Sequence, residues 1–384
     1  MRFEFATATR IVFGTGTLPE VAVAAGTFGK RALLVTGKTP DRAAPLLAAL
    51  RQRGLAVASF AVAGEPSTDL VELGVALGRR EQADVVVAMG GGSVIDAGKA
   101  IAGMATQTEG LLHFLEVVGQ GQALTRPTLP FIAVPTTAGT GTEVTRNAVL
   151  LSPTHGVKAS LRSPLLLARV AVVDPELTRD LPPALTASTG MDALTQLIEP
   201  FVSCRANPLV DALCREGMAR VARSLGRVFG EPAHAEGRTD MALASLFSGL
   251  ALANAALGAV HGFAAPIGGM FPAPHGAVCA ALLPHVMAVN LRALHRRQPQ
   301  APALDRYQEC ARLLTGRSDV TADDGVAWVV RLCANLRIPS LRAYGLQARD
   351  VPTVCEKAAV ASSMKGNPLP LTSEELTEVL TGAL

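Results

Sequence analysis

The sequence predicts an α/β domain with a doubly wound parallel sheet over residues 1–180, followed by an all-helical domain over residues 181–384. Between Arg31 and Asp174, short apolar runs rich in β-branched residues alternate with stretches of helical length, as expected of strands buried between helices. After Asp180 such runs fade, and segments rich in Ala, Leu and Arg continue almost to the C-terminus. A chain of 384 residues is also near the size at which one hydrophobic core divides into two.

The expected strands and helices of the first domain follow one another regularly. The N-terminal segment ending in RIVFGTG is expected to form the first strand. Further strands are expected at 32–37, 55–60, 84–90, 131–135 and 170–175, with helices at 41–53, 69–80 and 93–102. Parallel strands end at one edge of the sheet, and ligands of such sheets bind outside that edge.

Composition excludes several classes of protein. The chain is 49% hydrophobic and 17% charged, which is typical of a globular protein rather than a disordered one. Its net charge of +3 arises from 35 basic and 32 acidic residues spread evenly, and only 4% of residues are aromatic, so nucleic acid is not an expected partner. The six cysteines are widely spaced without a CxxC pair, and the N-terminus does not resemble a signal peptide, so we expect a cytoplasmic protein.

A long segment, residues 241–291, contains no Asp, Glu, Lys or Arg. Its first part, ALASLFSGLALANAALGAV, is about the ~20 residues that a membrane span requires. It is rich in Ala, Gly and Ser and is followed by His261, Pro266 and His275. We therefore expect a buried helix of a large domain and no membrane partner.

A glycine-rich turn follows the expected strand at 84–90. Gly90, Gly91, Gly92 and Ser93 lead into the next helix, where glycines allow close approach of a ligand and free N–H groups attract phosphate. A tight strand-to-helix turn would also require one glycine, but three glycines and a serine favour a pyrophosphate site. The turn lacks the GxGxxG spacing, so it does not by itself identify a dinucleotide.

A second loop, residues 135–143 (PTTAGTGTE), follows the strand at 131–135 and is expected at the same edge of the sheet. Its hydroxyl groups can bond a phosphate or a ribose, although threonines of this kind also cap helices.

The helical half contains a candidate metal site. Asp192 and Gln196 lie four residues apart in an apolar segment and share one helix face, while His261 and His275 lie in the segment without charges. A buried carboxylate requires a partner, and a carboxylate, two imidazoles and an amide oxygen can hold one divalent ion. Each histidine could equally be a hydrogen-bonded core residue.

Several long motifs, in the same order, resemble the iron-containing (group III) alcohol dehydrogenases. They are RIVFGTGTL, GGGSVIDAGKAIA, PTTAGTGTEVT, LPPALTASTGMDALTQLIE, GAVHGFAAPIGGMFPAPHGAVCAALLPHV and the late Gly366-Asn367-Pro368. The resemblance covers nearly the whole chain. It implies a Rossmann-like N-terminal domain, a helical C-terminal domain, an architecture similar to dehydroquinate synthase, a divalent metal such as Fe²⁺ or Zn²⁺, and NAD or NADP as the oxidoreductase cofactor.

The resemblance also implies roles for individual residues. The pyrophosphate would lie at Gly91, Gly92 and Ser93, with further cofactor contacts at Thr136, Thr137 and Thr140 and with Lys158 near the nicotinamide ribose. Asp192, His261 and His275 match metal ligands and catalytic residues, and Gln196 occupies the position of the fourth ligand.

Three positions depart from the family pattern. Gln196 replaces a histidine, and its amide oxygen is a weaker donor. We therefore expect weaker metal binding, the choice of a different metal, or a set of two histidines and one carboxylate in which Gln196 contacts the metal weakly or only contacts a ligand. Ala265 stands where a histidine near the nicotinamide is common, which removes any proton relay through that imidazole. Gly37 stands where members that prefer NAD commonly have an Asp, so NADP becomes acceptable.

The sequence thus predicts a metal-dependent NAD(P) alcohol dehydrogenase or aldehyde reductase that acts on a small alcohol or carbonyl compound, with a homodimer as the default assembly. The alternatives are a metal-independent enzyme resembling maleylacetate reductase, a lyase resembling dehydroquinate synthase, and an inactive nucleotide-binding protein.

Overall fold

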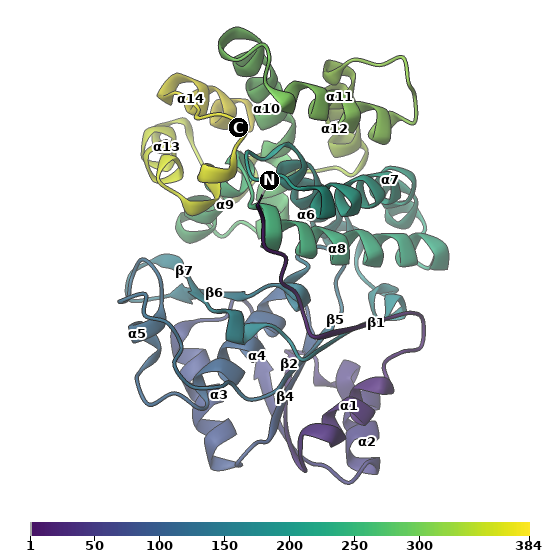
Figure 1. Ribbon diagram of the computed structural model, residues 1–384, viewed down its shortest axis with the longest axis vertical. Coiled ribbons are helices and arrows are strands. Elements are labelled where there is room, and N and C mark those ends of the chain that lie inside the picture. Colours follow the sequence, from purple (N-terminus) through teal and green to yellow (C-terminus); the bar gives the residue numbers. More distant parts are fainter. Residues whose placement is uncertain (1) are drawn as a thin grey trace. The chain divides into compact units, whose positions relative to one another are not determined.

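The chain forms two units, shown in Figure 1 by a computed structural model that describes residues 2–384. The α/β unit comprises Ala6–Thr137 and Gly141–Thr178. The helical unit comprises Arg179–Leu384, the short segment Ala138–Thr140 and the N-terminal segment that ends at Phe5. A single domain boundary near residue 180 would instead place Ala138–Thr140 and the N-terminal segment in the α/β unit. Ala138 belongs to the helical unit because its side chain packs in the core of that unit.

A sheet of six parallel strands lies at the centre of the α/β unit, in the order β1-β8-β5-β4-β2-β3. This confirms the predicted parallel sheet. In β4 every residue is buried, which explains its continuous apolar sequence. The strands are β1 Arg10–Phe13, β2 Arg31–Gly37, β3 Ala56–Val62, β4 Val85–Gly90, β5 Phe131–Pro135 and β8 Val170–Val173.

Helices cover both faces of this sheet. Val21 of α1 and Leu46 of α2 pack with one set of alternating strand side chains. On the other face α4 lies directly on the sheet, because a Cβ at Gly98 would lie 2.6 Å from Cβ of Ala88 in β4. These helices are α1 Glu20–Phe28, α2 Ala44–Gln52, α3 Thr68–Arg80, α4 Gly92–Met104 and the short α5 Leu111–Phe114.

This unit also contains a second, antiparallel sheet, which was not predicted from the sequence. Strands β6 (Asn147–Ser152) and β7 (Val157–Arg162) form a hairpin. Their burial alternates between buried and half-buried residues, so they lack the continuous apolar run by which the other strands were recognised.

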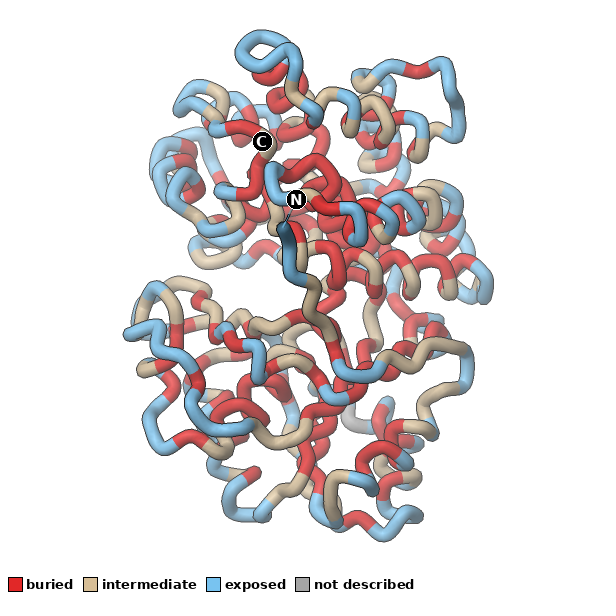
Figure 2. Tube along the Cα trace, in the orientation of Figure 1, coloured by how far each residue is buried: buried red, intermediate tan, exposed pale blue. Residues whose placement is uncertain are grey.

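Arg179–Leu384 is helical throughout its regular elements, as predicted, and its buried residues gather in its interior in Figure 2. Helices α6, α7, α8 and α10 supply most of this core. The helices are α6 Pro183–Val202, α7 Pro208–Gly230, α8 Ala235–Ala255, α9 Ala259–Met270, α10 His275–Arg297, α11 Pro302–Thr315, α12 Ala322–Asn335, α13 Val351–Ala359 and α14 Ser373–Gly382.

The uncharged segment 241–291 is divided among three helices. Helices α8 and α9 together are long and apolar enough for a span, but they are bent by 99° at the break between them. Helix α10 also passes that test of length and composition, and 78% of its most apolar window is buried inside the structure. Burial in the core therefore accounts for the apolar composition.

Candidate functional site

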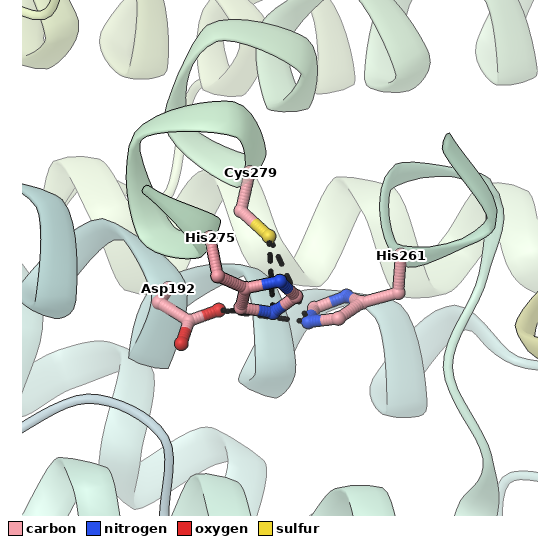
Figure 3. Close-up of side chains that lie close together, drawn as sticks. All are labelled: Asp192, His261, His275 and Cys279. Carbon is pink, nitrogen blue, oxygen red and sulfur yellow. Dashed lines mark hydrogen bonds and ion pairs between the residues drawn. The ribbon is translucent and has the colours of Figure 1, made fainter. Parts of the chain in front are cut away.

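Four side chains from three helices of the helical unit point toward one another in Figure 3. Asp192 lies on α6, His261 on α9, and His275 and Cys279 one turn apart on α10. Oδ1 of Asp192 lies 3.5 Å from Nε2 of His261 and 3.6 Å from Nε2 of His275. Sγ of Cys279 lies 3.8 Å and 3.7 Å from these two nitrogens. The structure thus brings together three residues that the sequence nominated as ligands, and it adds a sulfur atom.

These separations fit a single divalent ion. With metal–ligand distances of about 2.0–2.3 Å, donors around a tetrahedral ion lie about 3.3 Å apart for nitrogen or oxygen pairs and about 3.6 Å apart for a nitrogen and a sulfur. The observed separations of 3.5–3.8 Å are close to these values. Asp192, His261 and Cys279 are buried, while the side chain of His275 is 39% exposed. His275 is therefore the most exposed of the four side chains.

The charges around the site favour a cation. Burial alone would raise the pKa of Asp192, but the neighbouring His275 and His261 hold it below its ordinary value. Burial also opposes a charge on His261, yet Cys279 and Glu199 raise the pKa of that imidazole well above its ordinary value. A metal ion supplies the same compensating positive charge to these buried acidic groups.

Glu199 orients His261 through Nδ1, the ring nitrogen on the side away from the cluster. Its Oε2 accepts a hydrogen bond from Nδ1 of His261 at 2.6 Å, and its Oε1 accepts one from the backbone N–H of Val260 at 2.7 Å. Oδ1 of Asn367 accepts from the N–H of Ala259, so two distant side chains satisfy the first N–H groups of α9. Because Nδ1 of His261 is used in this way, Nε2 is the ring nitrogen that faces the cluster.

Glu199→Gln is expected to lower metal affinity by about 10–100-fold, because an amide cannot accept from Nδ1 of His261 and from Val260 N–H at once. Equilibrium competition with a chromophoric chelator measures this. Glu236→Gln, at an exposed glutamate in the first turn of α8, is the control and is expected to change nothing. An unchanged affinity in Glu199→Gln contradicts the orienting role.

Gln196 is bound to its surroundings through its amide nitrogen. The hydroxyl of Ser248 donates to the carbonyl of Ser245, and the carbonyls of Gly139 and Thr140 only accept. The amide therefore fits with Nε2 donating to Ser248 Oγ at 2.8 Å, Gly139 O at 3.2 Å and Thr140 O at 3.3 Å. An amide ligates a metal through its oxygen, so a weak or indirect role of Gln196 at the metal stays a prediction.

Cys279 and Glu199 were not predicted as site residues from the sequence. The spacing of each residue from a predicted ligand could have indicated it. Cys279 follows His275 by four residues, which places both on one helix face, and Glu199 follows Asp192 by seven, which also returns to one face. Neither spacing shows that α6, α9 and α10 converge, so only the structure shows that the four side chains lie together.

The predicted phosphate-binding residues lie at the carboxyl edge of the parallel sheet. Gly91 is the N-cap of α4, and this helix has no side-chain cap, so Gly92 and Ser93 begin it with N–H groups available to a ligand. A Cβ at Gly91 would lie 3.3 Å from Cγ2 of Thr137, so the glycine turn and the threonine loop are adjacent. The N–H of Thr136 donates to Gly90 O.

The remaining predicted residues lie on several elements. Gly37 ends β2 at the same edge, whereas Thr140 belongs to the helical unit. Lys158 lies on β7, and its Nζ forms an ion pair with Oε2 of Glu65 at 3.1 Å. Ala265 is exposed on α9, one turn after His261.

The buried side chain of Lys99 connects α4 to residues 142–147, at the end of the threonine-rich loop 135–143 and just beyond it. It is 1% exposed, and its Nζ donates to Thr142 O at 2.8 Å, to Thr145 Oγ1 at 2.9 Å and to Asn147 O at 2.7 Å. Burial lowers the pKa of Lys99 to about 8, although Asp96 acts in the opposite direction. The helix that carries the glycine turn is thereby fastened to its neighbouring loop.

Glu143, beside this cluster, makes stability depend on pH. Burial raises its pKa from 4.5 to about 7. As pH rises, the unfolded chain therefore releases this proton at a lower pH than the folded protein does. The free energy of unfolding falls progressively between pH 4.5 and about 7 for this reason, and the loss is constant above about pH 7. We expect Glu143→Gln to gain stability over the wild type across that window. Urea unfolding near both ends measures it, with the exposed Glu72→Gln as control; a gain independent of pH contradicts the assignment.

Comparisons with known proteins cover both halves of the chain. The sequence pattern of iron-containing alcohol dehydrogenases matches residues 8–175, and the C-terminal pattern of the Fe-containing alcohol dehydrogenase family matches residues 186–384. The 1,3-propanediol dehydrogenase of Klebsiella pneumoniae is 38% identical over 363 residues, which cover 92% of each chain.

Solved structures agree with these matches. That of a 1,3-propanediol oxidoreductase has a TM-score of 0.93 and 34% identity over 100% of both chains. That of sulfoacetaldehyde reductase from Bifidobacterium kashiwanohense, in complex with NAD⁺, has a TM-score of 0.87 and 29% identity over 99% of this chain and 98% of the other. The chain belongs to the iron-containing alcohol dehydrogenase family and is an oxidoreductase that acts on the CH–OH group of alcohols.

Proposed function

We propose that the chain is a metal-dependent NAD(P) alcohol dehydrogenase or aldehyde reductase for small alcohols and carbonyl compounds. The observation that carries the proposal is the convergence of Asp192, His261 and His275, with Glu199 orienting one imidazole. These three ligands would hold a divalent ion, Fe²⁺ or Zn²⁺, with Gln196 in an outer role. When bound, such an ion supplies a Lewis acid for the alcohol or carbonyl oxygen.

The chain's own residues supply binding and orientation. Asp192 would hold the ion as a charged donor, and Glu199 retains the proton on Nδ1 of His261 so that Nε2 remains a donor. Ala265 offers no imidazole for proton transfer, so protons would reach the site by another route.

The dinucleotide would bind at the carboxyl edge of the sheet. The adjacency of Gly91 and Thr137 and the uncapped start of α4 support a pyrophosphate at Gly91, Gly92 and Ser93. Thr136, Thr137 and Thr140 would add hydroxyl contacts, and Lys158 would lie near the nicotinamide ribose. The cofactor supplies or accepts the hydride.

Cofactor preference tests the role of Gly37. We expect the wild type to accept NADP(H) at least as well as NAD(H), and Gly37→Asp to shift preference toward NAD(H), because a carboxylate there accepts from a ribose 2′-OH and repels a 2′-phosphate. The site admits the change, since a Cβ at Gly37 meets only Cγ2 of Val94, at 3.9 Å. Values of kcat/KM for NAD(H) and NADP(H), measured on the wild type and on Gly37→Asp, test this preference. A wild type that strongly prefers NAD(H) contradicts the prediction.

Similarity to relatives supports a proposal for the substrate class. A 1,3-propanediol dehydrogenase that is 38% identical supports a short alcohol or diol and the corresponding aldehyde. We further propose that the protein is a cytoplasmic homodimer without a nucleic-acid or membrane partner. Size-exclusion chromatography with light scattering tests the oligomeric state.

The direct test is a panel of short aldehydes and hydroxyaldehydes with NADH and NADPH, using protein reconstituted with Fe²⁺, with Zn²⁺ or without metal. We expect turnover only with metal. Full activity in exhaustively chelated protein would favour the metal-independent alternative, for which the replacement of a histidine ligand by Gln196 is the supporting observation.

A further inference from the structure

We propose that Cys279 is a metal ligand in this chain, and that its thiolate replaces the donor which the family pattern expects at Gln196. The inference rests on the proposed metal-dependent function and specifies how this chain would hold the ion. It follows from the position of one sulfur atom relative to two imidazoles and a carboxylate.

The position of the sulfur is that of a fourth donor. Sγ of Cys279 lies 3.8 Å from Nε2 of His261 and 3.7 Å from Nε2 of His275, close to the ~3.6 Å expected between sulfur and nitrogen donors of one tetrahedral ion. All four ligand atoms lie within 4.8 Å of one another. In Figure 3 the thiol is directed toward the two imidazole nitrogens.

The backbone supports this arrangement. His275 and Cys279 are one turn apart at the start of α10, so one rigid helix carries both donors. Gly276 allows that helix to lie directly on α6, since a Cβ there would lie 2.4 Å from Ser188 O and 3.3 Å from Cβ of Asp192. The sulfur is buried, and the most exposed donor is His275, which leaves that side for a substrate oxygen.

Gln196 has only its amide oxygen to offer a metal. Its amide nitrogen is engaged with Ser248, Gly139 and Thr140. A neutral amide oxygen is in any case a weaker donor than a thiolate toward Zn²⁺ or Co²⁺. Ligation by Cys279 requires that the thiol release its proton to water as the metal–sulfur bond forms, and the metal then carries two anionic and two neutral protein donors.

This donor set has a consequence for metal choice. A thiolate favours Zn²⁺ and Co²⁺ over the harder Fe²⁺ and Mn²⁺. Substrate oxygen would enter as a fifth ligand, which zinc accommodates during catalysis. We therefore expect this chain to bind Zn²⁺ more tightly than Fe²⁺, and to lose most of that selectivity when the sulfur is removed.

The test uses Co²⁺ as the probe on the full-length, metal-free protein. The wild type is expected to develop thiolate-to-cobalt charge-transfer absorption in the near ultraviolet, which saturates at one equivalent together with the visible cobalt bands. Cys279→Ser is expected to keep the visible bands and lose the charge-transfer band, while its Zn²⁺ affinity falls by more than the ~10–100-fold typical of losing an outer-shell partner.

Cys204→Ser is the matched control, because it removes an exposed thiol that could bind cobalt adventitiously, and it is expected to retain the full band. Circular dichroism checks the fold of each variant, and the wild-type spectrum is informative whether or not Cys279→Ser folds. A wild type that binds Co²⁺ without the charge-transfer band, or a Cys279→Ser variant that keeps it, overturns the Cys279 proposal alone. A wild type that binds neither Co²⁺ nor Zn²⁺ overturns the metal-dependent function as well.

Discussion

His261→Ala is expected to abolish both metal retention and reductase activity. The substitution removes a donor that lies within 3.8 Å of Asp192 Oδ1 and Cys279 Sγ, and it leaves the Glu199 carboxylate without its imidazole partner. Lewis-acid stabilisation by a metal contributes several kcal/mol, so we expect a loss of about a thousandfold or more in kcat/KM.

Elemental analysis and steady-state rates on the same preparations measure this effect. The control is His295→Ala, which removes an exposed imidazole from the last turn of α10, the helix that also carries His275. The control is expected to retain metal and rate. A His261→Ala protein that is folded, free of metal and fully active would refute the Lewis-acid mechanism.

Gly276→Ala is expected to have the second-largest effect on activity. The added Cβ would lie 2.4 Å from the carbonyl oxygen of Ser188, so the start of α10 must move away from α6. That movement carries His275 and Cys279 away from Asp192. Displacement of a reacting group by about 1 Å can cost about 100-fold in rate, and we expect a loss of this order.

The cost in stability should be about 1–3 kcal/mol, as is usual for overpacking between helices. Gly226→Ala is the control because Gly226 is an exposed residue of α7 with nothing within 4 Å of an added Cβ. It should leave activity unchanged and raise stability slightly, since alanine favours helix. If Gly276→Ala retains wild-type kcat and metal affinity, close helix packing does not control the geometry of the site.

The parallel sheet could be predicted because its central strands are buried on both faces and therefore read as unbroken apolar runs, as in β4. The hairpin β6–β7 could not, because its half-buried strands have a mixed pattern. Likewise, Ala138–Thr140 lies within the predicted first domain but packs with the helical unit, where Gly139 lies against Thr189. Such assignments depend on contacts between residues far apart in the chain.

The amino-acid sequence alone determined the two fold classes, the glycine turn at Gly91 and the identity of Asp192, His261 and His275 as candidate ligands. These depend on residue type and on local periodicity, which a single chain displays directly. Only the tertiary structure showed that Cys279 lies beside these candidate ligands, that Glu199 is hydrogen-bonded to His261 and that the amide nitrogen of Gln196 fits against Ser248 and the carbonyls of Gly139 and Thr140. The physical reason is that ligand geometry is set by the packing of α6, α9 and α10, and helix packing depends on side-chain shapes that no local spacing encodes.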